Sequence, residues 1–180
     1  MKKKCLILFS VCLGYTLSAI TITNFGTGAW ADSDFTNFSV DSQDANGLAF
    51  SGADTSVLSG DVPLVDLSSV WGNDLTLTGN VTTNPGTTFS VILFDEEFQQ
   101  AQFSGGSWTD LESGLAVLSL TSVGDSFDFS RVIGIDINGG GLGDALVASL
   151  TGATIVPEPS AYGAIAGFLA LGWVMLRRRG

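Results

Sequence analysis

Histidine is absent from the sequence, and its two cysteines, Cys5 and Cys12, lie near the N-terminus. Beyond them the chain cannot form Ser-His-Asp or Cys-His catalytic groups, zinc sites of His and Cys ligands, or a disulfide. Lysine is equally restricted, because Lys2, Lys3 and Lys4 are the only lysines. Schiff-base chemistry is therefore excluded from the rest of the chain, and a carboxylate pair is the catalytic option that remains.

Positive charge is also scarce in the middle of the chain. Arg131 is the only basic residue between Ile20 and Val156, whereas 17 of the 18 acidic residues lie in that span. Such a surface repels nucleic acid and anionic lipid, which excludes functions that depend on binding phosphate groups. The acidity is typical of a protein that stays soluble outside the cell, or of one that binds divalent cations.

The C-terminal end carries an uncharged apolar segment, residues 161–176, followed directly by Arg177, Arg178 and Arg179. As a helix these 16 residues would be about 24 Å long, against roughly 30 Å of membrane hydrocarbon. The arginines can reach the headgroups, and they orient the C-terminus towards the cytoplasm. The sequence thus predicts a C-terminal transmembrane helix. A buried helix of a soluble domain is the alternative.

The N-terminal end has the pattern of a signal peptide. Basic residues 1–4 precede the apolar residues 5–17, and small residues follow. We expect signal peptidase to cleave after Ala19, because residues 20–25 alternate like a first strand. Cleavage after Ala31, in Ala29-Trp30-Ala31, is the alternative. The two ends predict the same topology, since both basic clusters would stay in the cytoplasm while residues 20–155 are translocated across the membrane.

Residues 156–180 resemble the PEP-CTERM sorting signal of exported bacterial proteins. The motif Val156-Pro157-Glu158-Pro159 precedes the apolar segment, and the arginine-rich tail follows it. The resemblance implies sorting by an exosortase, a membrane-embedded cysteine transpeptidase that cleaves near the motif. It also implies transient anchoring in the inner membrane and a final location at the cell surface or outside the cell.

The domain between the two ends is predicted to be all-β. Residues 74–79 alternate strictly, with leucines expected inward and threonines outward. Residues 91–94 form a continuous apolar run, which is typical of a strand deep in a sandwich. Short strands with Gly-, Asn- and Asp-rich joints favour an antiparallel β-sandwich, of the jelly-roll type. The predicted strands are 20–25, 35–41, 48–51, 74–79, 87–94, 99–103, 115–120, 131–137 and 145–150.

Three joints between strands are predicted from their residues. Asn84-Pro85-Gly86 has the composition of a turn, since proline presets φ and glycine accepts positive φ. Asp95-Glu96-Glu97 is expected to form a solvated turn before Phe98 re-enters the fold. The glycine-rich residues 139–143 are expected to form a loop.

Three tryptophans are candidate carbohydrate contacts: Trp30, Trp71 and Trp108. Each lies in a Gly- and Asp-rich joint, and a loop makes a ring more available for binding than a strand does. Exposed aromatic rings can stack on the faces of sugar rings, while Asp, Asn and Gln bind the hydroxyl groups. The alternative is that these rings cap the ends of the core.

Two groups of oxygen-bearing side chains are candidate calcium ligands, because calcium needs several hard oxygen ligands from a bent loop. They are Asp32 with Asp34, and Asp136 with Asn138 and Asp144. Neither group has the EF-hand spacing, and Asp and Asn are also ordinary turn formers. No cofactor other than calcium is indicated.

The sequence as a whole predicts an exported, non-enzymatic β-sandwich that binds extracellular polysaccharide, with no nucleic acid partner. A purely structural or adhesive matrix protein is one alternative. A carboxylate-dependent glycoside hydrolase is another, since such enzymes need two carboxyl groups in a cleft. Asp95, Glu96, Glu97 and Glu112 are available for that role, but nothing in the sequence marks a pair.

Overall fold

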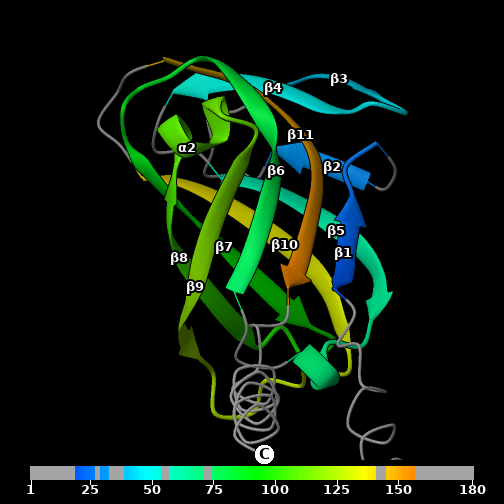
Figure 1. Ribbon diagram of the computed structural model, residues 1–180. Helices are drawn as coiled ribbons and strands as arrows, with labels where there is room; N and C mark the ends of the chain where they lie inside the picture. The colour runs from blue at the N-terminus through cyan, green and yellow to red at the C-terminus, as the bar shows by residue number, and fades with distance from the viewer. Residues whose placement is uncertain are drawn as a thin grey trace, which may run out of the picture. The chain divides into compact units, whose positions relative to one another are not determined.

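The computed structural model describes residues 19–26, 29–32, 39–53, 57–70, 74–140 and 145–156 (Figure 1). Within these ranges, residues 19–156 form one compact unit. Its elements are β1 (Ile20–Asn24), β2 (Ala29–Asp32), β3 (Ser39–Asp44), β4 (Gly47–Ala53), β5 (Val57–Val65), the 3-10 helix η1 (Ser68–Val70), β6 (Asp74–Thr83), β7 (Thr88–Asp95), β8 (Gln100–Ser107), α2 (Trp108–Glu112), β9 (Leu115–Val123), β10 (Val132–Gly140) and β11 (Ala145–Val156).

The strands form one curled antiparallel sheet that folds over on itself as two layers. Along the sheet the strand order is β2-β5-β10-β7-β8-β9-β6-β11-β4-β3, and β1 pairs with β11. Strand β9 joins the layers: residues 115–118 pair with β6, and residues 119–123 pair with β8. We call the layer with β6, β11, β4, β3 and β1 sheet A, and the layer with β2, β5, β10, β7 and β8 sheet B. The predicted antiparallel all-β fold is confirmed, whereas the jelly-roll type remains a prediction.

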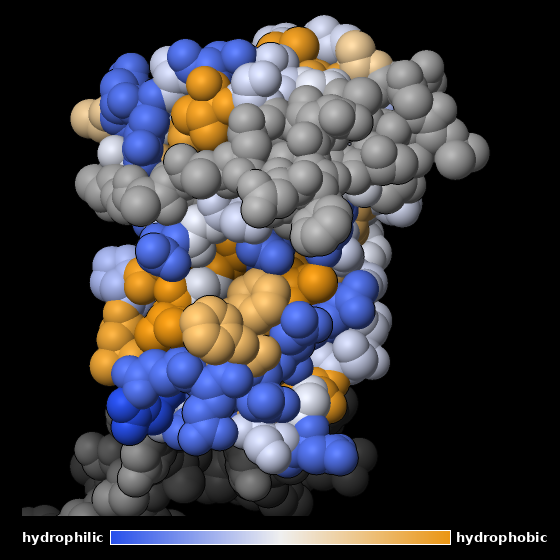
Figure 2. All heavy atoms as spheres, turned by 180° about the vertical axis from the view of Figure 1, so that it is seen from behind, coloured by the Kyte–Doolittle hydropathy of each residue, from blue (hydrophilic) through white to orange (hydrophobic). Residues whose placement is uncertain are grey.

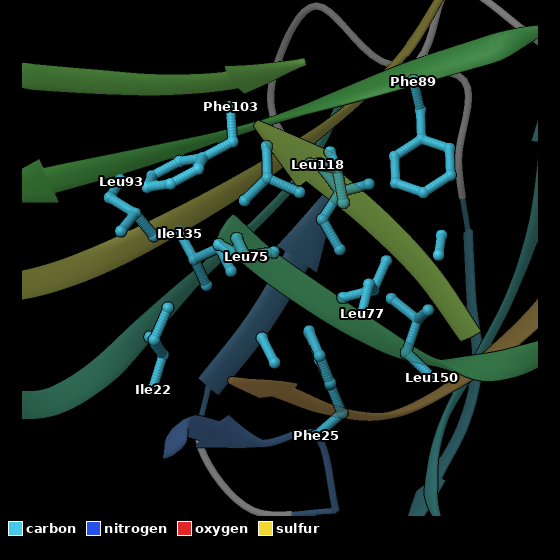
Figure 3. Packing of buried hydrophobic residues seen from close by; sticks show 14 of the residues in the cluster. Ile22, Phe25, Leu75, Leu77, Phe89, Leu93, Phe103, Leu118, Ile135 and Leu150 are labelled. Atoms are coloured by element: carbon cyan, nitrogen blue, oxygen red, sulfur yellow. The ribbon is translucent and has the colours of Figure 1, made fainter. Parts of the chain in front are cut away.

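The core lies between the two layers, where the inward residues of both sheets meet. Leu75 and Leu77 of sheet A are fully buried, as the alternation in residues 74–79 predicted. In Figure 3 they lie in the same space as Leu93, Phe103 and other side chains of sheet B. Period-two alternation thus gives each sheet one apolar face, and the fold buries the two apolar faces against each other.

Strand β5 was not predicted, and Pro63 is one reason. Proline cannot donate to a strand ladder, so it lowers the strand signal of its segment. The structure tolerates Pro63 because the β5–β10 register shifts between Val132 and Gly134, and because β2 pairs with β5 only at residues 58–61. Pro63 therefore lies at an irregular and partly unpaired stretch. Strand β2 was also missed.

Several predicted boundaries and joints need correction. The strand predicted at 35–41 continues to Asp44 as β3 (Ser39–Asp44), and residues 33–38 lie outside the described ranges. Gly139 and Gly140 continue β10 and are not loop residues. The turn at Asn84-Pro85-Gly86 is confirmed: Gly86 has φ +74°, and its N–H donates to Asn84 Oδ1 at 2.7 Å.

The β7–β8 turn differs from its prediction in two ways. Asp95 is 2% exposed instead of solvated, and Phe98 is 75% exposed instead of re-entering the core. Phe98 also has φ +59°, which is rare for a bulky residue. Its backbone N–H donates to the Asp95 carbonyl at 2.9 Å, so the geometry of the turn holds the ring outward.

The predicted sorting signal falls largely outside the described residues. Val156 is the last residue of β11 and pairs with Asp74. Pro157, Glu158, Pro159 and the three arginines lie beyond the described ranges, as do residues 1–18. Within the described part of the chain, no helix has the length and apolar character that a membrane crossing requires.

Candidate functional site

The outer surface of sheet B combines apolar and polar side chains on neighbouring strands. Residues that alternate with the buried positions of β5, β7, β8 and β10 point away from the core, and most of them are half-buried. Figure 2 shows hydrophobic side chains beside hydrophilic ones across the middle of the molecule, seen from behind. We call this surface the sheet B face and define it by Ser59, Asp61, Ser90, Ile92, Phe94, Gln100, Gln102, Asp136 and Asn138.

Strand register arranges the sheet B face in rows that run across the strands. In one row Asp136 lies opposite Ser59 on one side and Ile92 on the other, and Ile92 lies opposite Gln102. Neighbouring strands are about 4.8 Å apart, so four strands give a row about 14 Å long. The row combines the hydrogen-bonding side chains of Ser59, Asp136 and Gln102 with the apolar side chain of Ile92, a composition suited to an extended ligand with both characters.

Phe94 is the aromatic residue of this surface, and Gly134 gives it room. The two residues are partners in the β7–β10 register, and Phe94 also lies opposite Gln100. A Cβ atom built on Gly134 would meet Phe94 Cβ at 3.5 Å and Cδ2 at 3.7 Å. The phenyl group therefore covers the glycine backbone, an arrangement that supports a glycine within a sheet.

Asp136 is the half-buried carboxylate of the sheet B face. Burial raises the pKa of Asp136, and a hydrogen bond from the Ser59 side chain acts in the opposite direction. A carboxylate accepts hydrogen bonds strongly, whereas the side-chain amides of Gln102 and Asn138 can both donate and accept. Together these groups can bind a ligand rich in hydroxyl groups.

We expect the pH dependence of stability to change in the variant Asp136→Asn. Because the folded-state pKa of Asp136 is raised, its ionisation lowers the free energy of unfolding as the pH rises from the unfolded-state pKa to the folded-state pKa. The variant lacks this loss, so its stability relative to wild type should increase between acidic and neutral pH. The gain should be about 1 kcal/mol or less, since water screens a half-exposed group.

Urea unfolding of the full chain at several pH values measures this difference. Asp61→Asn is the matched control, because Asp61 is an exposed carboxylate on the same face. A difference between Asp136→Asn and wild type that is constant with pH would contradict the prediction.

A separate pocket of about 300 Å³ lies at the β7–β8 turn. It is lined by Asp95, Glu96, Glu97, Ser126, Asp128 and Arg131. Asp95 Oδ1 accepts the N–H groups of Glu97 and Gln99 at 2.9 and 2.8 Å, and Oδ2 accepts the N–H of Asp128 at 2.9 Å. Asp95 thus connects the β7–β8 turn to the loop between β9 and β10.

Glu96, Asp128 and Arg131 of this pocket are also engaged within the protein. Arg131 forms an ion pair with Glu96. The hydroxyl and the N–H of Ser130 donate to Asp128 at 2.6 and 2.9 Å, and these bonds lower the pKa of Asp128. The pocket is therefore built from turn-forming bonds. Glu112 is not among its lining residues, and lies on α2.

The structure gives the three candidate tryptophans different outcomes. Trp108 is the first residue of α2, is 1% exposed, and packs on Phe89 with 4.3 Å between ring centroids. Its prediction as a surface contact is wrong, and the alternative that the ring caps the core is confirmed. Trp30 lies in β2, where it pairs with Gly60, and the structure describes only its backbone. Trp71 lies outside the described residues.

The candidate calcium ligands are only partly described. Asp136 and Asn138 lie two residues apart on β10 and share the sheet B face. Asp34 and Asp144 fall outside the described residues, and Asp32 is described only by its backbone in β2. Among the residues that the structure describes, no group of three or more metal-binding side chains converges. The calcium sites therefore remain predictions without support from the geometry.

Sequence reasoning missed Phe94, Ile92, Gln100 and Gln102. The apolar run 91–94 predicts a strand deep in the sandwich, but of these four residues only Val91 and Leu93 are fully buried. Ile92 and Phe94 point outward and are half-exposed. An alternation between glutamine and buried residues in β8 was the available signal, because Gln100 and Gln102 flank the buried Ala101.

Solved structures of similar fold include the following two. One is the family 30 carbohydrate-binding module of a cellulosomal cellulase of Clostridium thermocellum, at 12% identity and a TM-score of 0.50, covering 80% of this chain and all of the module. The other is the crystal structure of an agarase, at 12% identity and a TM-score of 0.51, covering 77% of this chain and 25% of the enzyme. At such identity the likeness shows the β-sandwich fold alone.

Sequence searches add no relative to these structures. No protein-family model matches the chain, and no curated protein matches it significantly.

Proposed function

We propose that this protein is an exported, non-enzymatic β-sandwich module that binds polysaccharide through the sheet B face. The observation that carries the proposal is the row of Asp136, Ile92 and Gln102 beside Phe94, which places hydrogen-bonding groups next to aromatic surface. A sugar ring has hydroxyl groups at its edge and apolar C–H groups on its faces, so it can satisfy both. The fold shared with a carbohydrate-binding module supports this proposal.

Binding is expected to depend on the ring of Phe94. The full chain in mild detergent should bind at least one polysaccharide of a panel that includes agarose, soluble cellulose derivatives and the exopolysaccharide of the source organism. Phe94→Ala should weaken that binding about tenfold or more, because an aromatic anchor at a binding surface contributes more than 1 kcal/mol. Isothermal titration or affinity electrophoresis measures the change.

Val117→Ala is the control for this experiment. Val117 is 47% exposed on β9 and pairs with Thr76 of sheet A, so its substitution removes exposed apolar surface away from the sheet B face. An equal loss in both variants would contradict a site on sheet B. The absence of binding to every polysaccharide, with or without calcium, would favour a purely structural matrix protein.

A carboxylate-dependent hydrolase is the second candidate, because the agarase has a region of the same fold. That region is a quarter of the enzyme, and in the pocket described above Asp95, Glu96 and Asp128 are engaged in bonds within the protein. Release of new reducing ends from the polysaccharide panel, abolished by changing one acidic residue to its amide, would overturn the non-enzymatic proposal.

We further propose that residues 156–180 direct sorting by an exosortase, on the grounds of the sequence motif. The variant with Pro157→Ala and Pro159→Ala should accumulate as an unprocessed membrane-bound form in a host that has an exosortase. Cell fractionation with intact-mass analysis measures this. The single exchange Pro85→Ala, in a turn of the domain, is the control. Release of the double variant at the normal mass would show that the motif is inert.

A further inference from the structure

We propose that the sheet B face selects uncharged polysaccharides and rejects polyanionic ones. This inference rests on the proposed function, and it concerns the chemical class of the ligand. It follows from the charges on the face and from the location of the domain's single cation.

The nine residues that define the sheet B face include two acidic residues and no basic one. Asp136 and Asp61 lie on adjacent strands, in neighbouring rows of the register. The other polar side chains of the face are amides and hydroxyls: Ser59, Ser90, Gln100, Gln102 and Asn138. Such groups exchange hydrogen bonds with sugar hydroxyls in both directions, because both partners donate and accept.

The cation that an acidic polysaccharide would need is engaged elsewhere. Arg131 is the only basic residue between Ile20 and Val156, and it precedes β10 in the pocket at the β7–β8 turn, where it pairs with Glu96. Carboxylate and sulfate groups are normally bound by arginine or lysine. On the sheet B face they would meet Asp136 and Asp61 instead, and they would lose hydration without gaining a counter-charge.

The long-range field acts in the same direction. The span from Ile20 to Val156 has 17 acidic residues and one basic residue, so a polyanion is repelled before contact. This repulsion is screened by salt, since the Debye length falls from about 30 Å at 0.01 M to about 3 Å at 1 M ionic strength. The local effect of Asp136 and Asp61 at contact is screened much less.

Two pairs of polymers, each with an uncharged and a charged member of related backbone, test the inference. Agarose is compared with a sulfated carrageenan, and hydroxyethyl cellulose with carboxymethyl cellulose, by affinity electrophoresis of the full chain in mild detergent. We expect the uncharged member of at least one pair to bind about tenfold or more tightly than its charged counterpart at low salt. Salt should narrow the difference without removing it.

Variants separate the local charges from the overall field. The double variant Asp61→Asn with Asp136→Asn should reduce the preference for the uncharged polymer about threefold or more. The control is Asp110→Asn with Asp125→Asn, which removes the same charge from exposed positions outside the face. It should leave the preference within about twofold of wild type.

The outcomes distinguish this inference from the proposed function. Binding of the charged polymer as tight as that of its uncharged partner would overturn the selectivity and leave polysaccharide binding in place. An equal effect of the two double variants would also overturn selection by the face. If the protein bound none of the four polymers and no polysaccharide of the wider panel, both the selectivity and the proposed function would be overturned.

Discussion

Asp95→Ala is expected to lower the free energy of unfolding by about 3 to 5 kcal/mol, one of the two largest effects that we predict. Asp95 is 2% exposed, and its carboxylate accepts the backbone N–H groups of Glu97, Gln99 and Asp128. Removing the carboxylate leaves these three donors without their acceptor. The bonds are partly buried, and a donor that loses a charged acceptor in such a place costs more than the net gain from an ordinary hydrogen bond.

Neighbouring acidic residues are the controls for Asp95. Glu97→Ala should change stability by less than about 0.5 kcal/mol, because Glu97 is exposed on the same turn. Glu96→Gln should cost below about 1 kcal/mol, since its ion pair with Arg131 is exposed to solvent. Urea unfolding measures all three variants. If Asp95→Ala lowered the free energy of unfolding no more than Glu96→Gln does, the hydrogen bonds of Asp95 would not stabilise the fold as we argue.

The predictable part of the fold came from period-two alternation. Residues 74–79 show it plainly, and Leu75 and Leu77 are buried as expected. Turn chemistry was equally informative at Asn84-Pro85-Gly86, where glycine takes the positive φ that the turn requires. Both signals are local, so each can be interpreted without knowledge of the rest of the chain.

The unpredicted part depends on tertiary context. Pro63 argues against a strand, yet β5 accommodates it at a register shift that only the pairing with β10 reveals. Asp95 belongs to a turn by composition, but its burial depends on the loop that contains Asp128, 33 residues further along the chain. The same limit applies to Phe98, whose outward position is set by the bonds that Asp95 makes.

The candidate site was predictable only in part, for a related reason. Asp136 and Asn138 were identified as oxygen-bearing residues, and the structure places them on the sheet B face. Their neighbours Ile92 and Gln102 come from other strands, and the register that aligns them cannot be deduced from one sequence. Asp136 was a candidate calcium ligand in the sequence, whereas the polar and apolar side chains of its row support our proposal of a ligand rich in hydroxyls.

Trp108 allows stability and binding to be tested separately, because sequence and structure assign it different roles. Its ring contacts Phe89 of sheet B, and it lies 6.4 Å between centroids from Phe50 of sheet A. Trp108→Ala should therefore lower the free energy of unfolding by about 3 to 5 kcal/mol, the usual cost of deleting a buried aromatic side chain. Trp108→Phe should cost less, because a ring still fills part of the cavity.

Polysaccharide binding by the folded Trp108 variants should remain at the wild-type level, since the ring is 1% exposed and contributes nothing to the sheet B face. Phe94→Ala should show the reverse pattern, with weakened binding and a smaller loss of stability, because Phe94 is only half-buried. Thermal unfolding and isothermal titration of Trp108→Phe and Phe94→Ala measure both properties in variants that retain the core.

If Trp108→Phe weakened binding as strongly as Phe94→Ala does, the end of the sandwich at α2 would have to be part of the ligand site. If each variant changed binding and stability as expected, the aromatic contact with the ligand would belong to Phe94 of β7 and not to Trp108, one of the three candidates from the sequence.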